Sequence, residues 1–266
     1  MTVAAADRRG SVRDAYLVGR QVRYEQLAFW RNPFGAIFTV GFSVVFLLLL
    51  AAGGGNSRVA YLGNIRLIQY YVPGFAAYGV MSACFNMLGI QLVIRRETGL
   101  LKRLRLSPLP TWALLSGIFV NAAIISATQV VVLFVIGRFA FDVHLPHNYA
   151  ALVLALVVGV LCFTALGVAI STVIPNQEAA GPIISIVYFV LLFLSGLWFP
   201  LNPGSSLAQI SAYFPVRHLI LAVFAPFQLQ RGESPWAWHD LLVMAIWGVA
   251  ACVVAFRRFR WEPRRN

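Results

Sequence analysis

Residues 151–171 read ALVLALVVGVLCFTALGVAIS, a run of 21 residues that contains no charged side chain. A helix needs about 20 mostly apolar residues to cross the roughly 30 Å hydrocarbon core of a bilayer. The run lacks the apolar and polar alternation that a strand of a membrane barrel requires. It therefore predicts a membrane-spanning helix. Because similar runs recur along the chain, the sequence predicts an all-α integral membrane protein.

The composition agrees with this class. Of the 266 residues, 60% are hydrophobic and 11% are charged, and the mean hydropathy is +0.77, which a water-soluble domain of this size does not have. We predict one transmembrane domain over residues 34–256, preceded by an arm (1–33) and followed by a basic tail (257–266). The predicted spans are residues 34–52, 70–93, 111–137, 148–174, 180–199 and 240–256.

The basic residues are distributed unequally between the two sides of these spans. Sixteen of the 21 Lys and Arg lie in the arm, in the loop between the second and third spans, and in the tail. By the positive-inside rule these segments, and hence both termini, are cytoplasmic. The net charge of +12 could suggest nucleic acid, but the arginines flank spans and suit an anionic inner leaflet. We expect a lipid bilayer and no nucleic acid as partner.

The placement of titratable residues argues against several chemistries. The nine acidic residues fall in arms, loops or span ends, whereas ion-coupled carriers generally need ionisable groups near the midplane, so a secondary transporter is disfavoured. The four histidines lie in or beside external loops without an HExxH pattern, and we expect no catalytic residue. The single lysine, Lys102, lies in GLLKRL and not in a phosphate-binding loop. Cys84, Cys162 and Cys252 lie in apolar runs, so we expect no disulfide and no metal.

Residues 95–108 read RRETGLLKRLRLSP, a basic segment between two apolar runs. On a helix, Leu100, Leu101 and Leu104 gather on one side together with Glu97, and the basic residues spread over the rest. One interpretation is a topology signal that rests on anionic lipid. The other is a short amphipathic helix that docks on another protein, where Glu97 would find its partner. The second interpretation also accounts for Glu97.

Two other segments have a recognisable pattern. In the arm, several arginines share one helical face opposite Val18, Val22 and Phe29, which is typical of an interfacial helix, although a solvated basic arm would have the same topology. Between the fifth and sixth spans, five prolines divide an external segment into apolar pieces that are too short to cross a bilayer.

The chain resembles the membrane subunits of ABC-2-type exporters, in particular those of bacterial drug and antibiotic exporters. The resemblance rests on the run from Glu97 and Gly99 to Ser107 and Pro108 in the first cytoplasmic loop. It rests also on NQEAAGPI (176–183), SGLWFPLNP (195–203) and ISAYFPVRHLI (210–220), and more weakly on RNP (31–33).

The resemblance implies six spans, a cytoplasmic coupling helix and external re-entrant half-helices in a multi-pass protein of the bacterial plasma membrane. It implies a permease that exports a hydrophobic or amphipathic substrate such as a drug, an antibiotic or a lipid-like molecule. A polysaccharide or glycolipid exporter is the alternative. The expected partners are a second permease copy and two ATPase subunits, which would hold the ATP and Mg while this chain binds no cofactor. A membrane scaffold without transport function would not need the docking pattern. The residues implied in ATPase docking are Glu97, Gly99, Leu100, Leu101, Leu104, Asn176, Gln177 and Glu178.

Polar residues also occur inside the predicted spans, where they either line a substrate pathway or hydrogen-bond one helix to another. The sequence leaves both roles open for each of them. The candidate pathway residues are Asn86, Asn121, Gln129, Ser185 and Tyr188, with Gln91 nearby.

Overall fold

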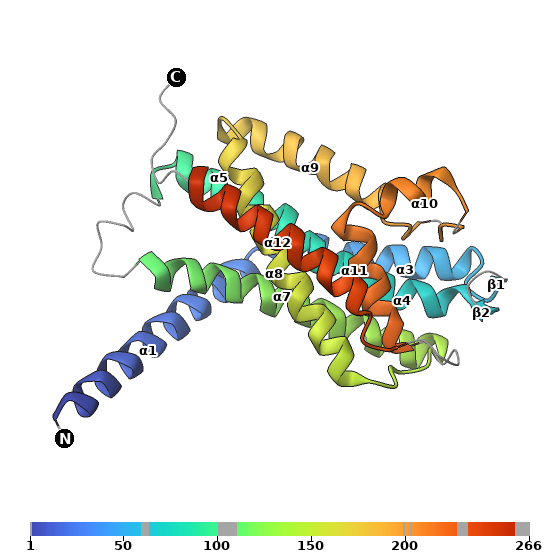
Figure 1. The fold of residues 1–266 in the computed structure, drawn as a ribbon, viewed down its shortest axis with the longest axis horizontal. Coiled ribbons are helices and arrows are strands. Elements are labelled where there is room, and N and C mark those ends of the chain that lie inside the picture. The colour runs from blue at the N-terminus through green and yellow to red at the C-terminus, as the bar shows by residue number, and fades with distance from the viewer. Residues whose placement is uncertain are drawn as a thin grey trace.

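A computed structural model of the chain describes all residues except 1, 60–63, 101–110, 199, 203, 228–233 and 259–266. The described part is almost entirely helical, and its long helices pack side by side in an elongated bundle (Figure 1). One antiparallel hairpin, β1 (Arg58–Val59) with β2 (Ile65–Arg66), lies between the first two predicted spans and was not predicted. The all-α class is confirmed.

Short helical turns of other types interrupt or extend several of the α-helices. The elements η1 and η3 are π-helical turns, and η4 is a 3-10 turn. The bounds are α1 (Thr2–Trp30), α2 (Pro33–Ala36), η1 (Ile37–Gly41), α3 (Phe42–Ala52), α4 (Leu67–Met81), η3 (Ser82–Met87), α5 (Leu88–Glu97), α7 (Thr111–Phe141), α8 (Tyr149–Val173), α9 (Gln177–Leu194), α10 (Ser206–Ser211), α11 (Pro215–Phe224), η4 (Ala225–Phe227) and α12 (Trp238–Arg258).

Within the part of the chain that the structure describes, five helical segments are long and apolar enough to cross a membrane. They are the continuous α4–η3–α5 segment and helices α7, α8, α9 and α12, which correspond to the second to sixth predicted spans. The first predicted span contains a shorter apolar helix, Thr39–Ala52, which begins within the π-helical turn η1 and continues through α3. Helix length alone therefore accounts for five of the six predicted spans.

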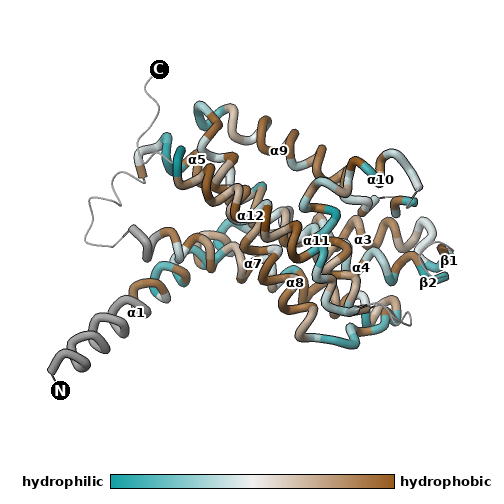
Figure 2. Tube along the Cα trace, viewed as in Figure 1, coloured by the Kyte–Doolittle hydropathy of each residue, from teal (hydrophilic) through white to brown (hydrophobic). Residues whose placement is uncertain are grey.

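The α4–η3–α5 segment is the central helix of the bundle. Of the residues in its most apolar window, 72% are buried, against 22% for α9 and 17% for α12. Close approach is possible where neighbours carry small residues. A Cβ added to Gly167 of α8 would lie 2.5 Å from the carbonyl oxygen of Cys84, so the backbones of α8 and η3 touch there. Figure 2 shows apolar residues along the bundle and polar residues at its ends.

We call the two ends of the bundle the basic end, where α5 ends at Glu97 and α8 leads into α9, and the hairpin end, where β1 and β2 lie (Figure 1). The short helices α10 and α11 lie in the proline-divided segment between α9 and α12. Neither is long enough to span a bilayer, as the sequence predicts.

A buried histidine joins α11 to α12. His218 Nδ1 lies 2.6 Å from Asp240 Oδ1, and its Nε2 lies 2.8 Å from the carbonyl oxygen of Ala212. A carboxylate and a carbonyl only accept, so the ring satisfies both contacts as the doubly protonated imidazolium. Burial lowers the pKa of His218, but the two hydrogen bonds and the charge of Asp240 outweigh burial and Arg217, and raise this pKa above 6.5. One potential ligand atom from each of His218, His239 and Asp240 lies within 4.8 Å of the other two. This cluster of potential metal ligands was not predicted from the sequence.

Candidate functional site: the basic end of the bundle

The last turn of α5 forms the centre of the basic end. Helix α5 continues to Glu97, Thr98 Oγ1 donates to the carbonyl of Ile94 at 2.8 Å, and Gly99 ends the helix with φ +70°, a conformation that favours glycine. The predicted amphipathic helix beginning at Arg95 is therefore wrong at its start, because residues 95–97 belong to α5. Leu100 is 41% exposed. Leu101 and Leu104 lie outside the described residues.

Arg96 connects α5 to the end of α8. Arg96 is 4% exposed, and its guanidinium donates to the carbonyl oxygens of Ser171 at 3.0 Å and Ile174 at 2.7 Å. These carbonyls lie where α8 ends and intrahelical donors run out, and the negative end of the helix dipole favours a cation there. A third bond runs from Nε to Glu97 Oε1 at 2.7 Å. Arg96 thus holds the two helix ends together.

This arrangement changes the prediction for Glu97. From the sequence we expected this carboxylate to find its partner on another protein. Instead Glu97 pairs with the neighbouring Arg96, and the two side chains are 13% and 5% exposed. The physical reason is that a buried guanidinium needs a counter-charge, and the adjacent carboxylate supplies one.

The second predicted docking segment lies beside this connection. Ile174, which accepts from Arg96, is followed by Pro175 and Asn176. Asn176 caps α9, since its Oδ1 accepts from the backbone N–H of Ala179 at 2.9 Å. Gln177 and Glu178 follow in the exposed first turn of α9, where the helix dipole favours a carboxylate. The described residues at the start of the first loop therefore meet those of the second at one end of the molecule.

Arg95 joins α5 to α1. Its guanidinium donates to both carboxylate oxygens of Glu25, at 2.7 and 2.6 Å, and Glu25 is 7% exposed. Gln21 also donates to Glu25 at 3.1 Å. The expectation that Arg95 faces lipid phosphates is therefore wrong. Glu25 was missed, although it is the single acid between residues 15 and 33 of a basic arm, a signal that could have marked it.

Asn121 and Gln129, two predicted pathway residues of α7, bond to different neighbours. Asn121 Oδ1 accepts from Gln26 of α1 at 2.8 Å. Gln129 is fully buried and donates to the Ser43 hydroxyl at 2.5 Å, with its amide pressed against Gly79. Both contacts join α7 to another helix, α1 for Asn121 and α3 for Gln129.

The remaining pathway candidates are placed apart from these. Tyr188 of α9 is buried and packs edge-on against Tyr78 of α4, with ring centroids 5.9 Å apart. Ser185 is half-buried on the same helix. Asn86 is half-buried in η3, and its Oδ1 is a buried acceptor without a partner among the described residues. Of the five predicted pathway residues, Asn121 lines the cavity described next.

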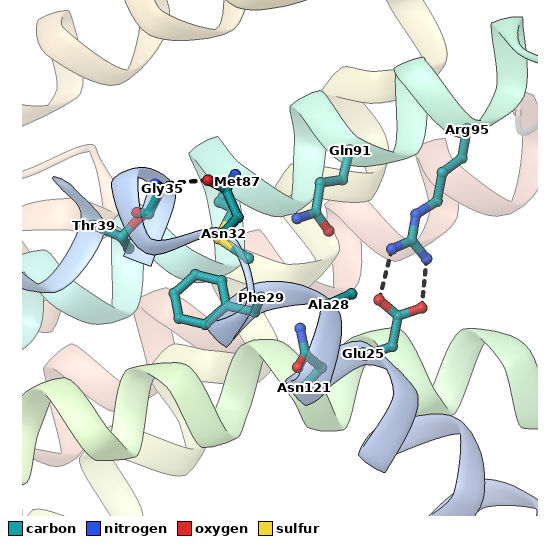
Figure 3. Close-up of a pocket in the computed structure, with 10 residues that line it drawn as sticks. All are labelled: Glu25, Ala28, Phe29, Asn32, Gly35, Thr39, Met87, Gln91, Arg95 and Asn121. Carbon is teal, nitrogen blue, oxygen red and sulfur yellow. Dashed lines mark hydrogen bonds and ion pairs between the residues drawn. The ribbon is translucent and has the colours of Figure 1, made fainter. Parts of the chain in front are cut away.

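A cavity of about 240 Å³ lies between α1, α2, α5 and α7, next to the Arg95–Glu25 pair (Figure 3). Sequence reasoning did not predict this cavity. It brings Asn121 together with Gln91, which lie on helices separated by a loop, and with Asn32 of the RNP motif. Its polar lining residues are Glu25, Asn32, Thr39, Gln91, Arg95 and Asn121.

Comparison with known proteins agrees with this architecture. Residues 56–257 match the family described as ABC-2 family transporter protein. The chain is 29% identical over 177 residues to the putative transport permease YvfS of Bacillus subtilis, covering 66% of this chain and 70% of that protein. It is 23% identical over 201 residues to the probable multidrug ABC transporter permease YbhR of Escherichia coli K12. That match covers 75% of this chain, which spans about half (54%) of YbhR. The family match extends over most of the chain and includes both loops joined by Arg96, and the chain accordingly belongs to the ABC-2 family of transporter membrane proteins.

Proposed function

We propose that this chain is the permease subunit of an ATP-driven exporter that carries a hydrophobic or amphipathic substrate out of a bacterial cell. The observation that supports the proposal most directly is the Arg96 connection, which joins the end of α5 to the turn between α8 and α9. A force applied to either loop at the basic end would reach three long helices together. This is what a subunit driven by a separate motor needs.

In this proposal two ATPase subunits dock at the basic end, which faces the cytoplasm, and ATP and Mg bind to them. A second copy of the permease completes the translocation unit. Both termini are cytoplasmic, the segment 34–52 forms the first of six spans, and α10 and α11 enter the outer leaflet as re-entrant helices. ATP binding closes the motors, and the motion passes through the basic end to open the helices outward.

The nature of the cargo is supported by chemistry and by the relatives. Among the described residues, the buried parts of the long helices carry amides and hydroxyls, while buried charges such as Arg96 lie near helix ends and are paired. This distribution favours a neutral or amphipathic cargo, and it argues against a mechanism coupled to ion transport. The similarity to YbhR, which is named a probable multidrug ABC transporter permease, supports the same class of cargo.

The test uses exposed residues at the basic end, because changing Arg96 would also disturb the fold. We expect Leu100→Asp and Glu178→Arg to reduce the amount of ATPase that co-purifies with the tagged permease, and to reduce its ATP hydrolysis. Leu145→Asp is the matched control, since Leu145 is 45% exposed and Leu100 is 41% exposed, but Leu145 lies in the loop that joins α7 to α8. The proposal fails if Leu100→Asp and Leu145→Asp retain the same ATPase and activity at equal membrane insertion.

A further inference from the structure

The cavity beside the Arg95–Glu25 pair presents hydrogen-bond donors that have no acceptor among the residues the structure describes. Asn32 Oδ1 accepts from the backbone N–H of Gly35 at 3.2 Å, and Asn121 Oδ1 accepts from Gln26 at 2.8 Å. These bonds fix which way each amide is turned. Each NH2 group is left without a partner among the described residues, and both residues line the cavity (Figure 3).

Gln91 supplies a third amide to the same space. It lies on α5 one turn before Arg95, and neither its oxygen nor its nitrogen has a hydrogen-bond partner in the described part of the chain. Asn121 is 3% exposed as a residue, but its amide nitrogen is not among the buried atoms without a partner, so the NH2 group is open to the cavity. An incoming ligand oxygen would accept from these donors in place of water, with a modest net gain for each hydrogen bond.

The charges around the cavity select against ions. Arg95 and Glu25 make a bidentate pair whose net charge is zero, so an anion or a cation would have to compete with an existing strong partner. A neutral ligand would leave the pair intact and accept from the three amides. The chemistry therefore favours an uncharged group rich in oxygen acceptors.

The size and depth of the cavity narrow the ligand further. A volume of about 240 Å³ is below the roughly 300 to 1,000 Å³ of sites that enclose drug-sized molecules, so one ring fits rather than a whole amphiphile. Met87, which also lines the cavity, is eight residues before Arg95, or about 12 Å along the helix. The cavity thus extends from the charged end of α5 toward the apolar core, as suits a head group whose tail stays in lipid.

We infer that this cavity binds an uncharged, oxygen-rich ring of the glycosyl class at the end of an amphipathic molecule. The site is distinct from the ATPase-docking surface. As a cargo site it rests on the proposed export function. As a site for a membrane glycolipid it would stand without that function.

The experiment measures protection of a cysteine in the cavity. Met87→Cys is made with Cys252→Ser, because Cys252 is exposed while Cys84 and Cys162 are buried. The full chain is placed in nanodiscs of phosphatidylethanolamine and phosphatidylglycerol, and the rate of maleimide labelling is measured. The probe is octyl β-glucoside below its micellar concentration. Octanol carries the same tail without the sugar, and octyltrimethylammonium replaces the sugar with a cation.

We expect the glucoside to slow labelling several-fold and the other two compounds to have little effect. Gln91→Leu should weaken protection about fivefold, as expected for one lost hydrogen bond. Asn121→Asp should also weaken it, because the variant keeps the acceptor for Gln26 but replaces the free donor with an oxygen. Gln209→Leu is the control, since Gln209 is an exposed amide on α10. Thermal midpoints establish that each variant is folded.

Equal protection by octanol and the glucoside, or no effect of Gln91→Leu, would overturn the inference. Two further arms identify the source of the ring. Glucosyl diacylglycerol built into the nanodisc would protect the cysteine if a membrane lipid binds there. Stimulation of ATP hydrolysis by the glucoside in the complex with its ATPase would identify a cargo site. Labelling needs no ATPase, so failure of the docking test leaves this measurement interpretable.

Discussion

Replacing Arg96 with methionine tests whether the basic end is held by this one side chain. The variant keeps most of the side-chain volume but removes three charge-assisted hydrogen bonds, to Ser171, Ile174 and Glu97. Removing one member of a buried ion pair costs about 3 to 5 kcal/mol, because the remaining charge is left uncompensated. We therefore expect Arg96→Met to lower the free energy of unfolding by about 3 to 5 kcal/mol.

The matched control is Arg66→Met at the hairpin end. Arg66 makes a charge-assisted bond to the backbone carbonyl of Asp142 at 2.8 Å, but this bond is exposed. Such a surface contact contributes about 0 to 1 kcal/mol. For a chain of this length, about 1 kcal/mol corresponds to a shift of about 2 to 4 °C in Tm. We therefore expect Arg96→Met to lower Tm by about 6 to 20 °C and Arg66→Met to lower it by about 4 °C at most.

The assay is the temperature at which detergent-solubilised protein loses its monodisperse elution peak. The double variant Arg96→Met with Glu97→Gln should lose less than the sum of the two single variants, because the second change removes the charge left unpaired by the first. Equal Tm shifts for Arg96→Met and Arg66→Met would refute the role of Arg96 in joining the helix ends.

Three further predictions concern other parts of the chain. The pKa of His218 is raised above 6.5, so its stabilising contact with Asp240 should be complete below pH 6.5 and lost as pH rises through the folded-state pKa. Across this pH range, the Tm of His218→Gln should fall less steeply than the Tm of the unchanged protein. Parallel Tm profiles for the two proteins would contradict the prediction. Gly117→Val should loosen α1, because a Cβ at Gly117 would lie 2.4 Å from a side-chain carbon of α1, and faster tryptic cleavage of α1 would reveal this; unchanged cleavage would count against the contact. An impermeant thiol reagent added to intact cells should label Ser57→Cys and not Ser11→Cys, and the opposite pattern would invert the proposed orientation.

The hydropathy pattern predicted the positions of the long helices correctly, but it predicted the wrong end for the second helix. The predicted span stops at residue 93, whereas α5 continues to Glu97. A hydropathy pattern treats two consecutive arginines as the start of a loop. Here Arg95 and Arg96 remain helical because Glu25 and the end of α8 supply their partners, and Gly99 ends the helix instead.

The predicted site residues likewise differ in whether their contacts are local or distant in sequence. Asn176, Gln177 and Glu178 follow from the local pattern, because a capping residue and an acidic first turn act within a few residues of chain. Asn121 was identified as a polar residue in a span, but its partner on α1 is 95 residues away in sequence. The periodicity of apolar residues along a helix cannot identify a partner that is so distant in sequence.

The amino-acid sequence by itself determined that the chain is a helical membrane protein, where its charge concentrates and which family its loops resemble. These properties depend on the transfer of each residue between water and lipid, and on motifs read along the chain. Only the tertiary structure decided that Arg96 binds the end of α8, that Glu25 holds Arg95, and that three amides surround one cavity. Helical periodicity shows which residues share a face, but the packing of that face against a distant helix determines which polar groups meet.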